Sequence, residues 1–201
     1  MSVAVVIAVR GGASAKSRFG GTVDGAALAK AMLADMIAAA KGCPAVEGVH
    51  VVTPTPEVAA GLDAELIVEA APAGIDAAFA RARTALPGRT LVLMLGDLPM
   101  MTADDLAALI AGHEAGMVTI VPSDTEGGTS AIVVDDGTPM RFAFGTGSFA
   151  RHMENAGALA RRFDCPGLAA DLDRPEDVAR VLAHGGAHSR ACLAATRRDA
   201  A

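Results

Sequence analysis

The sequence predicts a single α/β domain with a mostly parallel central sheet and helices on both of its faces. Short apolar runs alternate along the chain with stretches of helical periodicity, which is typical of strands joined by crossover helices. Two of the runs, Val3–Val9 and Leu91–Leu95, are apolar throughout, as expected of central parallel strands buried on both faces. No internal repeat or low-complexity linker divides the 201 residues, a length that fits one domain.

The other elements follow from periodicity and from turn residues. Further strands are expected at Val49–Thr53, Glu65–Val68, Val118–Val121 and Ala131–Val134. Helices are expected at Ala26–Ala40, at Gly74–Leu86, after Thr102, from Ser148 to Gly157, and from Asp173 to His184. The stretch from Gly185 onward has no clear period. We therefore expect a domain over residues 1–184 and, over residues 185–201, a C-terminal tail prone to fraying.

Composition and charge exclude several classes of protein. The net charge is −6 and there is no Trp or Tyr, so neither a general polyanion binder nor a base-stacking platform for nucleic acid is expected. The cysteines Cys43, Cys165 and Cys192 lack a CxxC pair, which indicates reduced thiols rather than a disulfide or zinc framework. No apolar run approaches the roughly 20 residues that span a bilayer. We expect a cytoplasmic protein with neither a nucleic-acid nor a membrane partner.

A Gly-rich loop with cationic residues, Arg10–Arg18, follows the first expected strand. Gly11 and Gly12 let backbone N–H groups approach phosphate oxygens, while Lys16 and Arg18 supply positive charge. The loop is not a Walker A loop, because alanine stands directly before Lys16, and it lacks a GxGxxG fingerprint. Ligands of α/β sheets bind beyond the carboxyl ends of the strands, so a phosphate site is predicted here. A solvated surface loop is the alternative.

Three aspartates are candidate ligands of a magnesium ion. Asp97 lies just past the buried run Leu91–Leu95, after Gly96, where a charged group must be paired or metal-bound. Asp171 and Asp173 alternate, which places both carboxylates on one face of an extended strand. Magnesium prefers carboxylate oxygens together with substrate phosphates. The alternatives are a turn in which Asp97 accepts backbone N–H bonds, and Asp173 as the N-cap of the last helix.

Two loops that combine glycine with hydroxyl residues lie in the second half of the chain, at Gly127–Ser130 and Gly145–Phe149. Backbone N–H and side-chain O–H groups in such loops can donate to an anion, and Ser148 at a helix N-terminus favours an anion site. Each loop alone is an ordinary turn, so the prediction rests on the presence of both.

Taken in order, these motifs resemble the 2-phospho-L-lactate guanylyltransferases, which serve biosynthesis of the deazaflavin coenzyme F-420. That family belongs to the nucleotidyltransferases with a Rossmann-like sheet and is related to the molybdenum-cofactor guanylyltransferases. The matching segments span nearly the whole chain and are Ala15–Arg18, Val51–Thr53, Gly96–Pro99, Gly128–Ala131, Phe144–Phe149 with His152, and Asp171–Asp177.

The resemblance implies a magnesium-dependent enzyme that joins GMP from GTP to a small phosphorylated acid and releases pyrophosphate. The acid would be 2-phospho-L-lactate, phosphoenolpyruvate or 3-phospho-D-glycerate. Catalytic roles are implied for Lys16, Arg18 and Asp97, and metal binding for Asp97, Asp171 and Asp173. Acid contacts are implied for Lys16, Thr129, Gly145 and Ser148, and nucleotide contacts for Gly11, Gly12, Ser17, Arg18, Gly74 and Asp76.

Two departures from the family pattern leave the substrate preference open. Asp76 stands where the family usually has Asn in a Gly-Leu-Asn stretch, and Ser130 stands where Asn usually follows the Gly-Thr pair. Asn both donates and accepts, whereas Asp only accepts and adds charge. Another nucleotidyltransferase, of molybdenum-cofactor or sugar-phosphate type, and a catalytically silent nucleotide-binding domain are the alternatives. The oligomeric state stays open, a homodimer included.

Overall fold

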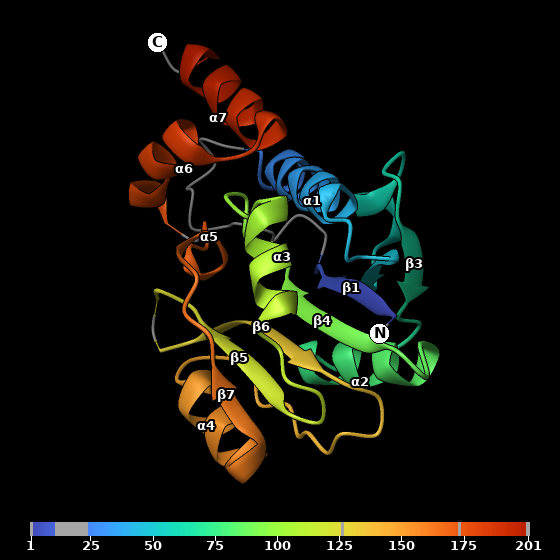
Figure 1. The fold of residues 1–201 in the computed structure, drawn as a ribbon. Coiled ribbons are helices and arrows are strands. Elements are labelled where there is room, and N and C mark those ends of the chain that lie inside the picture. The colour runs from blue at the N-terminus through green and yellow to red at the C-terminus, as the bar shows by residue number, and fades with distance from the viewer. Residues whose placement is uncertain (1, 11–23, 126, 173, 200–201) are drawn as a thin grey trace.

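The computed structural model describes residues 2–10, 24–125, 127–172 and 174–199, and its strands lie where the sequence has short apolar runs. They form a seven-stranded sheet with the order β3-β2-β1-β4-β6-β5-β7 (Figure 1). The strands are β1 (Val3–Ala8), β2 (Gly48–Thr53), β3 (Glu65–Val68), β4 (Thr90–Leu95), β5 (Val118–Pro122), β6 (Thr129–Val134) and β7 (Ala160–Arg162). Every strand expected from the sequence is present, and β7 is an additional edge strand.

All described strands except β6 run in one direction. β1 pairs in parallel with β2 and β4, whereas β6 is antiparallel to both β4 and β5. The reversal follows from the short connection between β5, which ends at Pro122, and β6, which begins at Thr129. A parallel pair would need a crossover of about a dozen residues or more. The prediction of a mostly parallel sheet is confirmed.

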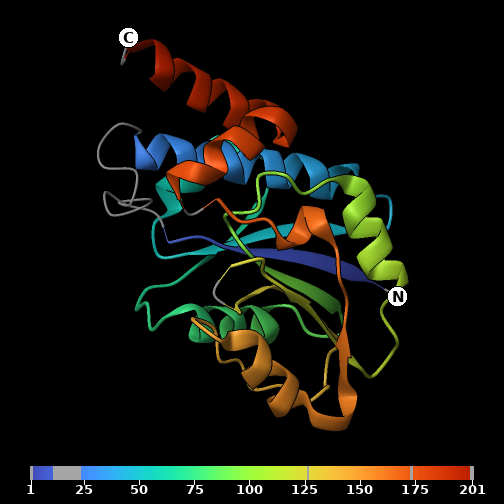
Figure 2. The same cartoon turned by 90° about the vertical axis from the view of Figure 1, so that its left-hand side faces the viewer.

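Helices cover both faces of the sheet, as predicted, and a further pair of helices near the C-terminus packs on the outside of one helical layer (Figure 2). α1 and α3 cover one face, α2 and α4 cover the other, and α6 and α7 pack on α1. The helices are α1 (Gly25–Gly42), α2 (Ile75–Ala85), α3 (Ala103–Ala111), α4 (Ser148–Ala156), α5 (Pro166–Ala169), α6 (Val178–His184) and α7 (Ala187–Asp199), with 3₁₀ turns η2 (Pro56–Ala59), η3 (Gly157–Leu159) and η4 (Pro175–Asp177). Within the described ranges, no helix is long and apolar enough to cross a membrane.

Helix α3 begins after Thr102, as expected from the sequence, and its first turn is capped by a reciprocal pair of hydrogen bonds. The Thr102 hydroxyl accepts from the Asp105 N–H at 3.1 Å, and the Asp105 carboxylate accepts from the Thr102 N–H at 2.9 Å. This reciprocal pair satisfies two backbone donors of the first turn. The helix expected from Asp173 to His184 is shorter, because Pro175 begins the 3₁₀ turn η4 and α6 begins only at Val178.

The segment after Gly185 differs from the expected fraying tail, because it forms helix α7. Leu193 of α7 is 2% exposed and packs in a cluster with Leu28 and Met32 of α1. The helix was missed because its composition is polar and its apolar contacts are few, so periodicity alone gives a weak signal. Burial against α1 stabilises it.

Asp35 of α1 caps the N-terminus of α7. Its carboxylate accepts from the N–H of His188 at 3.0 Å and from the N–H of Ser189 at 2.8 Å. A Cβ at Gly186 would overlap the Asp35 carboxyl group, so only glycine allows this close approach. A residue 153 positions away in the sequence therefore supplies the cap.

Replacing Asp35 by Ala is expected to lower the free energy of unfolding by about 1–2 kcal/mol, because two N–H groups of α7 lose their acceptor. Chemical denaturation measures the loss, and amide exchange at His188 and Ser189 should accelerate. Asp35→Asn is the matched control, since it retains one acceptor oxygen and should cost less. Equal stability of Asp35→Ala and the wild type would contradict the capping role.

Candidate active site

The carboxyl ends of β1 and β4 mark the point where the strand order reverses. β2 and β3 lie on one side of β1, and the chain then returns to place β4 on its other side. Ligands of open α/β sheets bind at such a point. The N–H of Gly96 donates to the Ala8 carbonyl at 3.0 Å, and a Cβ on Gly96 would lie 2.5 Å from Cγ2 of Val9. The two strand ends are therefore in direct contact, and Asp97 follows immediately.

Asp97 and Asp171 lie on neighbouring segments of backbone. The N–H of Leu172 donates to the carbonyl oxygen of Asp97 at 3.0 Å. Leu172 is fully buried in the cluster formed by α1, α6 and α7, which anchors its segment. The structure thus brings together two of the aspartates expected to hold a metal ion.

Two hydroxyl groups orient the Asp171 side chain, which is 9% exposed. Its Oδ2 atom accepts from Oγ of Ser123 at 3.0 Å and from Oγ1 of Thr125 at 2.6 Å. Both donors lie in the loop between β5 and β6. Neither residue was predicted from the sequence, because the only local signal was a generally polar loop.

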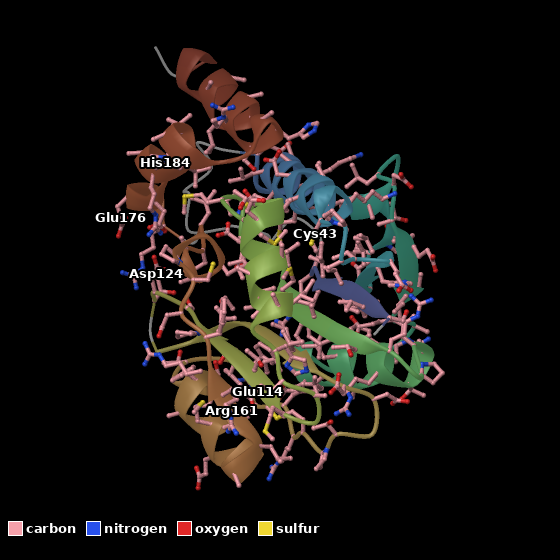
Figure 3. The ribbon with its side chains drawn as sticks, viewed as in Figure 1. Cys43, Glu114, Asp124, Arg161, Glu176 and His184 are labelled. Atoms are coloured by element: carbon pink, nitrogen blue, oxygen red, sulfur yellow. The ribbon has the colours of Figure 1, made fainter. Side chains whose placement is uncertain are left out.

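Arg180 of α6 ties the same loop to the Asp171 segment. Its guanidinium pairs with the carboxylate of Asp124 and donates to the backbone carbonyl of Asp171 at 3.3 Å. It also lies 3.5 Å from Asp177. Figure 3 shows Asp124 on the same side of the molecule as Glu176 of η4. Arg180 was likewise not predicted, since an arginine in a short helix carries no local functional signal.

The donor set at Asp97 and Asp171 fits a hard divalent cation, which prefers oxygen ligands. Among the residues that the structure describes, no group of three or more His, Cys, Asp or Glu is placed to hold a metal ion. Asp173, the third ligand implied by the resemblance, lies outside the described residues.

The two Gly-plus-hydroxyl loops meet at the start of α4. The N–H of Phe149 donates to the carbonyl of Gly127 at 3.1 Å, and the N–H of Ser148 donates to that of Gly145 at 2.9 Å. Gly145 has φ of 115° and Gly147 has φ of 69°, conformations that favour glycine. The two loops proposed from the sequence to bind an anion therefore lie next to each other in the structure.

Thr129 and Ser130, at the start of β6, are both buried. The Thr129 hydroxyl lies 2.9 Å from Nδ1 of His152, while the Ser130 hydroxyl donates to the Val121 carbonyl at 3.4 Å. Burial lowers the pKa of His152 to about 4. The imidazole is therefore neutral near pH 7. The Ser130 hydroxyl bonds within the sheet, to Val121 of β5.

Asp76 contacts the loop before α4. It lies in the first turn of α2, which Gly74 precedes with φ of 99°. Its Oδ1 atom accepts from the N–H of Phe144 at 2.9 Å. The nucleotide contacts implied for Gly74 and Asp76 stay predictions, and this bond shows that one carboxylate oxygen of Asp76 binds the protein backbone.

Residues 11–18 of the cationic loop after β1 lie outside the described residues. The roles implied for Gly11, Gly12, Lys16, Ser17 and Arg18 therefore stay predictions.

Comparison with known proteins identifies the family. Residues 3–199 match the family described as "Guanylyl transferase CofC like". The chain belongs to this family. It is 39% identical over 193 residues to the 3-phospho-D-glycerate guanylyltransferase of Phenylobacterium zucineum, with 88% of each chain covered. It is 38% identical over 175 residues to the phosphoenolpyruvate guanylyltransferase of Geodermatophilus obscurus, covering 85% of this chain and 80% of the relative.

A solved structure has the same fold. A nucleotidyl transferase from Methanothermobacter thermautotroptrophicus superimposes with a TM-score of 0.66 at 16% identity, covering 91% of this chain and 97% of the other. The resemblance inferred from the motifs is thus confirmed, as is the α/β nucleotidyltransferase fold. The protein is a nucleotidyltransferase of the guanylyltransferase type.

Proposed function

We propose that the protein transfers GMP from GTP to a small phosphorylated carboxylic acid in coenzyme F-420 biosynthesis. The observation that carries this proposal is the hydrogen bond from Leu172 to Asp97, which sets Asp97 and Asp171 side by side at the strand-order reversal. The acids named for the relatives, phosphoenolpyruvate and 3-phospho-D-glycerate, are candidate acceptors together with 2-phospho-L-lactate. A cytoplasmic location remains the prediction made from the sequence.

In the proposed reaction, a phosphate oxygen of the acid attacks the α-phosphorus of GTP. A new bond forms between them, the bond from the α-phosphorus to the bridging oxygen breaks, and pyrophosphate leaves with that electron pair. The nucleophile is already ionised near neutral pH, so no general base is required. Lys16 and Arg18 would offset the charge that develops on the leaving pyrophosphate.

Nucleotidyltransferases generally use a divalent metal ion, and we assign Mg²⁺ to Asp97, Asp171 and Asp173. When bound, the ion supplies positive charge that offsets the charge of the triphosphate. The convergent loops at the start of α4 support binding of the acid. The N–H groups of Ser148 and Phe149 already donate to backbone carbonyls, so the positive end of the α4 dipole and the buried Ser148 hydroxyl are the groups that would meet an anion here.

The decisive experiment measures pyrophosphate release from purified protein with Mg²⁺, each nucleoside triphosphate and each of the three acids in turn. We expect release with GTP and at least one acid. No release with any pair would overturn the proposal. Binding of GTP that is indifferent to Mg²⁺ would instead favour a catalytically silent nucleotide-binding domain.

Removing both hydroxyl donors to Asp171, by combining Ser123→Ala with Thr125→Val, is expected to weaken metal binding about 10- to 100-fold. The carboxylate would lose the bonds that fix its orientation. Mn²⁺ binding, followed by electron paramagnetic resonance without nucleotide, measures the effect independently of activity. Thr84→Val is the matched control, because its hydroxyl bonds within α2 to Ala80. Unchanged Mn²⁺ affinity would argue against Asp171 as a ligand.

A further inference from the structure

Side chains, rather than a sheet or a helix, hold the segment between β6 and α4. Residues 139–147 form neither helix nor strand. Arg151 of α4 donates to the carbonyl of Ala143 at 2.9 Å and to that of Thr146 at 2.7 Å. Asn155, one turn further along α4, donates to the Arg141 carbonyl at 2.9 Å. The helix that begins at the expected acid site thus also binds the loop that leads into it.

His152 makes the buried contact of this set, with 0% exposure. Its Nε2 atom lies 2.8 Å from the N–H of Ala143, and its Nδ1 atom lies 2.9 Å from Oγ1 of Thr129. The Phe144 ring meets the imidazole edge-on, with ring centroids 4.7 Å apart. His152 therefore lies between two segments, the loop carrying Gly145 and the start of β6.

These contacts determine which ring nitrogen carries the hydrogen. The Ala143 N–H is a donor, so Nε2 must accept and carries no hydrogen. In the neutral imidazole the hydrogen is then on Nδ1, which donates to Thr129. The hydroxyl hydrogen of Thr129 consequently points away from His152 and can be donated elsewhere.

The Ser148 hydroxyl is a second sign of a ligand at this place. It is 1% exposed at the first position of α4, and within the described part of the chain its Oγ atom has no hydrogen-bond partner. Buried hydroxyl groups normally make a hydrogen bond. A buried hydroxyl that makes none, next to a helix N-terminus, is suited to donate to an anion. His152 is one turn along the same helix.

We propose that His152 is a positioning residue for acid binding: its ring fixes the Ala143 amide on one side and the Thr129 hydroxyl on the other. The loop carrying Gly145 and the first turn of α4 then hold one conformation before the acid arrives. Such preorganisation removes an ordering cost from binding. The inference rests on the proposed function, because the acid is taken to bind at this loop.

Two conservative substitutions separate the two bonds of the ring. The amide of His152→Gln reaches the place of Nε2, so its oxygen can still accept from the Ala143 N–H. The shorter amide of His152→Asn reaches the place of Nδ1, so it can still donate to Thr129 but leaves the Ala143 N–H without an acceptor. Glu154→Gln, an exposed change on the same helix, is the matched control.

Amide exchange tests the hydrogen bond between His152 and the Ala143 amide without any assay of activity. We expect exchange at Ala143 to accelerate about tenfold or more in His152→Asn and much less in His152→Gln and Glu154→Gln. Equal exchange at Ala143 in all variants would overturn the proposal that His152 fixes the Ala143 amide. This measurement keeps its meaning even if the wild type transfers no GMP, an outcome that would overturn the proposed function and the role in acid binding together.

Steady-state kinetics test the link to the acid. We expect KM for the acid to rise about tenfold in His152→Asn and about threefold in His152→Gln, with kcat and KM for GTP within about twofold of the wild type. Glu154→Gln should match the wild type. An unchanged KM for the acid in His152→Asn, or an equal rise in KM for GTP, would overturn the positioning role.

Discussion

Asp97→Asn is expected to abolish guanylyl transfer, lowering kcat by about 10³-fold or more. The substitution keeps the size of the side chain and removes its charge, at the point where β1 and β4 end in contact. A neutral amide is a poor ligand for a hard divalent cation, so the triphosphate would lose the positive charge that the metal ion supplies. Pyrophosphate release at saturating GTP and acid measures the loss.

The control for Asp97→Asn is Asp63→Asn, the same chemical change at a distant surface site. The Asp63 side chain is 88% exposed and pairs with Lys41, so its removal should leave turnover unchanged. Circular dichroism and Mn²⁺ binding complete the experiment, since a folded variant with weak metal binding is the expected result. A fully active Asp97→Asn enzyme would refute the metal assignment.

The place of Asp97 at the end of a buried strand could be predicted from the sequence because its signal is local. An apolar run predicts a buried strand, the residues Gly-Asp-Leu-Pro end it abruptly, and parallel strands bring their carboxyl ends to one edge of the sheet. The structure confirms β4 and the contact of its end with β1. The strands and most of the helices were predictable for the same reason, since each depends on periodicity within about ten residues.

The residues that orient the site could not be found in this way. Ser123 and Thr125 reach Asp171 across 48 and 46 positions, and Asp76 reaches Phe144 across 68. Such partners are set by the tertiary fold, and a polar loop looks the same in the sequence whether or not it meets a carboxylate. The same holds for α7, whose cap comes from α1.

Phe79→Ala is expected to lower the free energy of unfolding by about 3–5 kcal/mol, a shift in Tm of about 10 °C. Phe79 of α2 is 0% exposed. Its ring lies 5.0 Å from that of Phe144 and 5.9 Å from that of Phe142, both in the loop before α4. The aromatic content of the chain is only 3%, so this cluster holds a large part of its ring contacts. Truncation leaves a cavity that aliphatic neighbours fill only in part.

The same change should also weaken acid binding. Phe79 packs against two side chains of the loop before α4, while Asp76 and His152 bond to the backbone of that loop. At temperatures well below the lowered Tm, KM for the acid should rise while KM for GTP changes little. Phe79→Leu retains most of the apolar volume and should cost less than about 1.5 kcal/mol. If Phe79→Ala lost stability with no change in KM for the acid, the hydrogen bonds of Asp76 and His152 alone would suffice to hold the loop. A parallel loss of stability and acid affinity would show that packing of the core under α2 and α4 also holds the acid-binding loop in place.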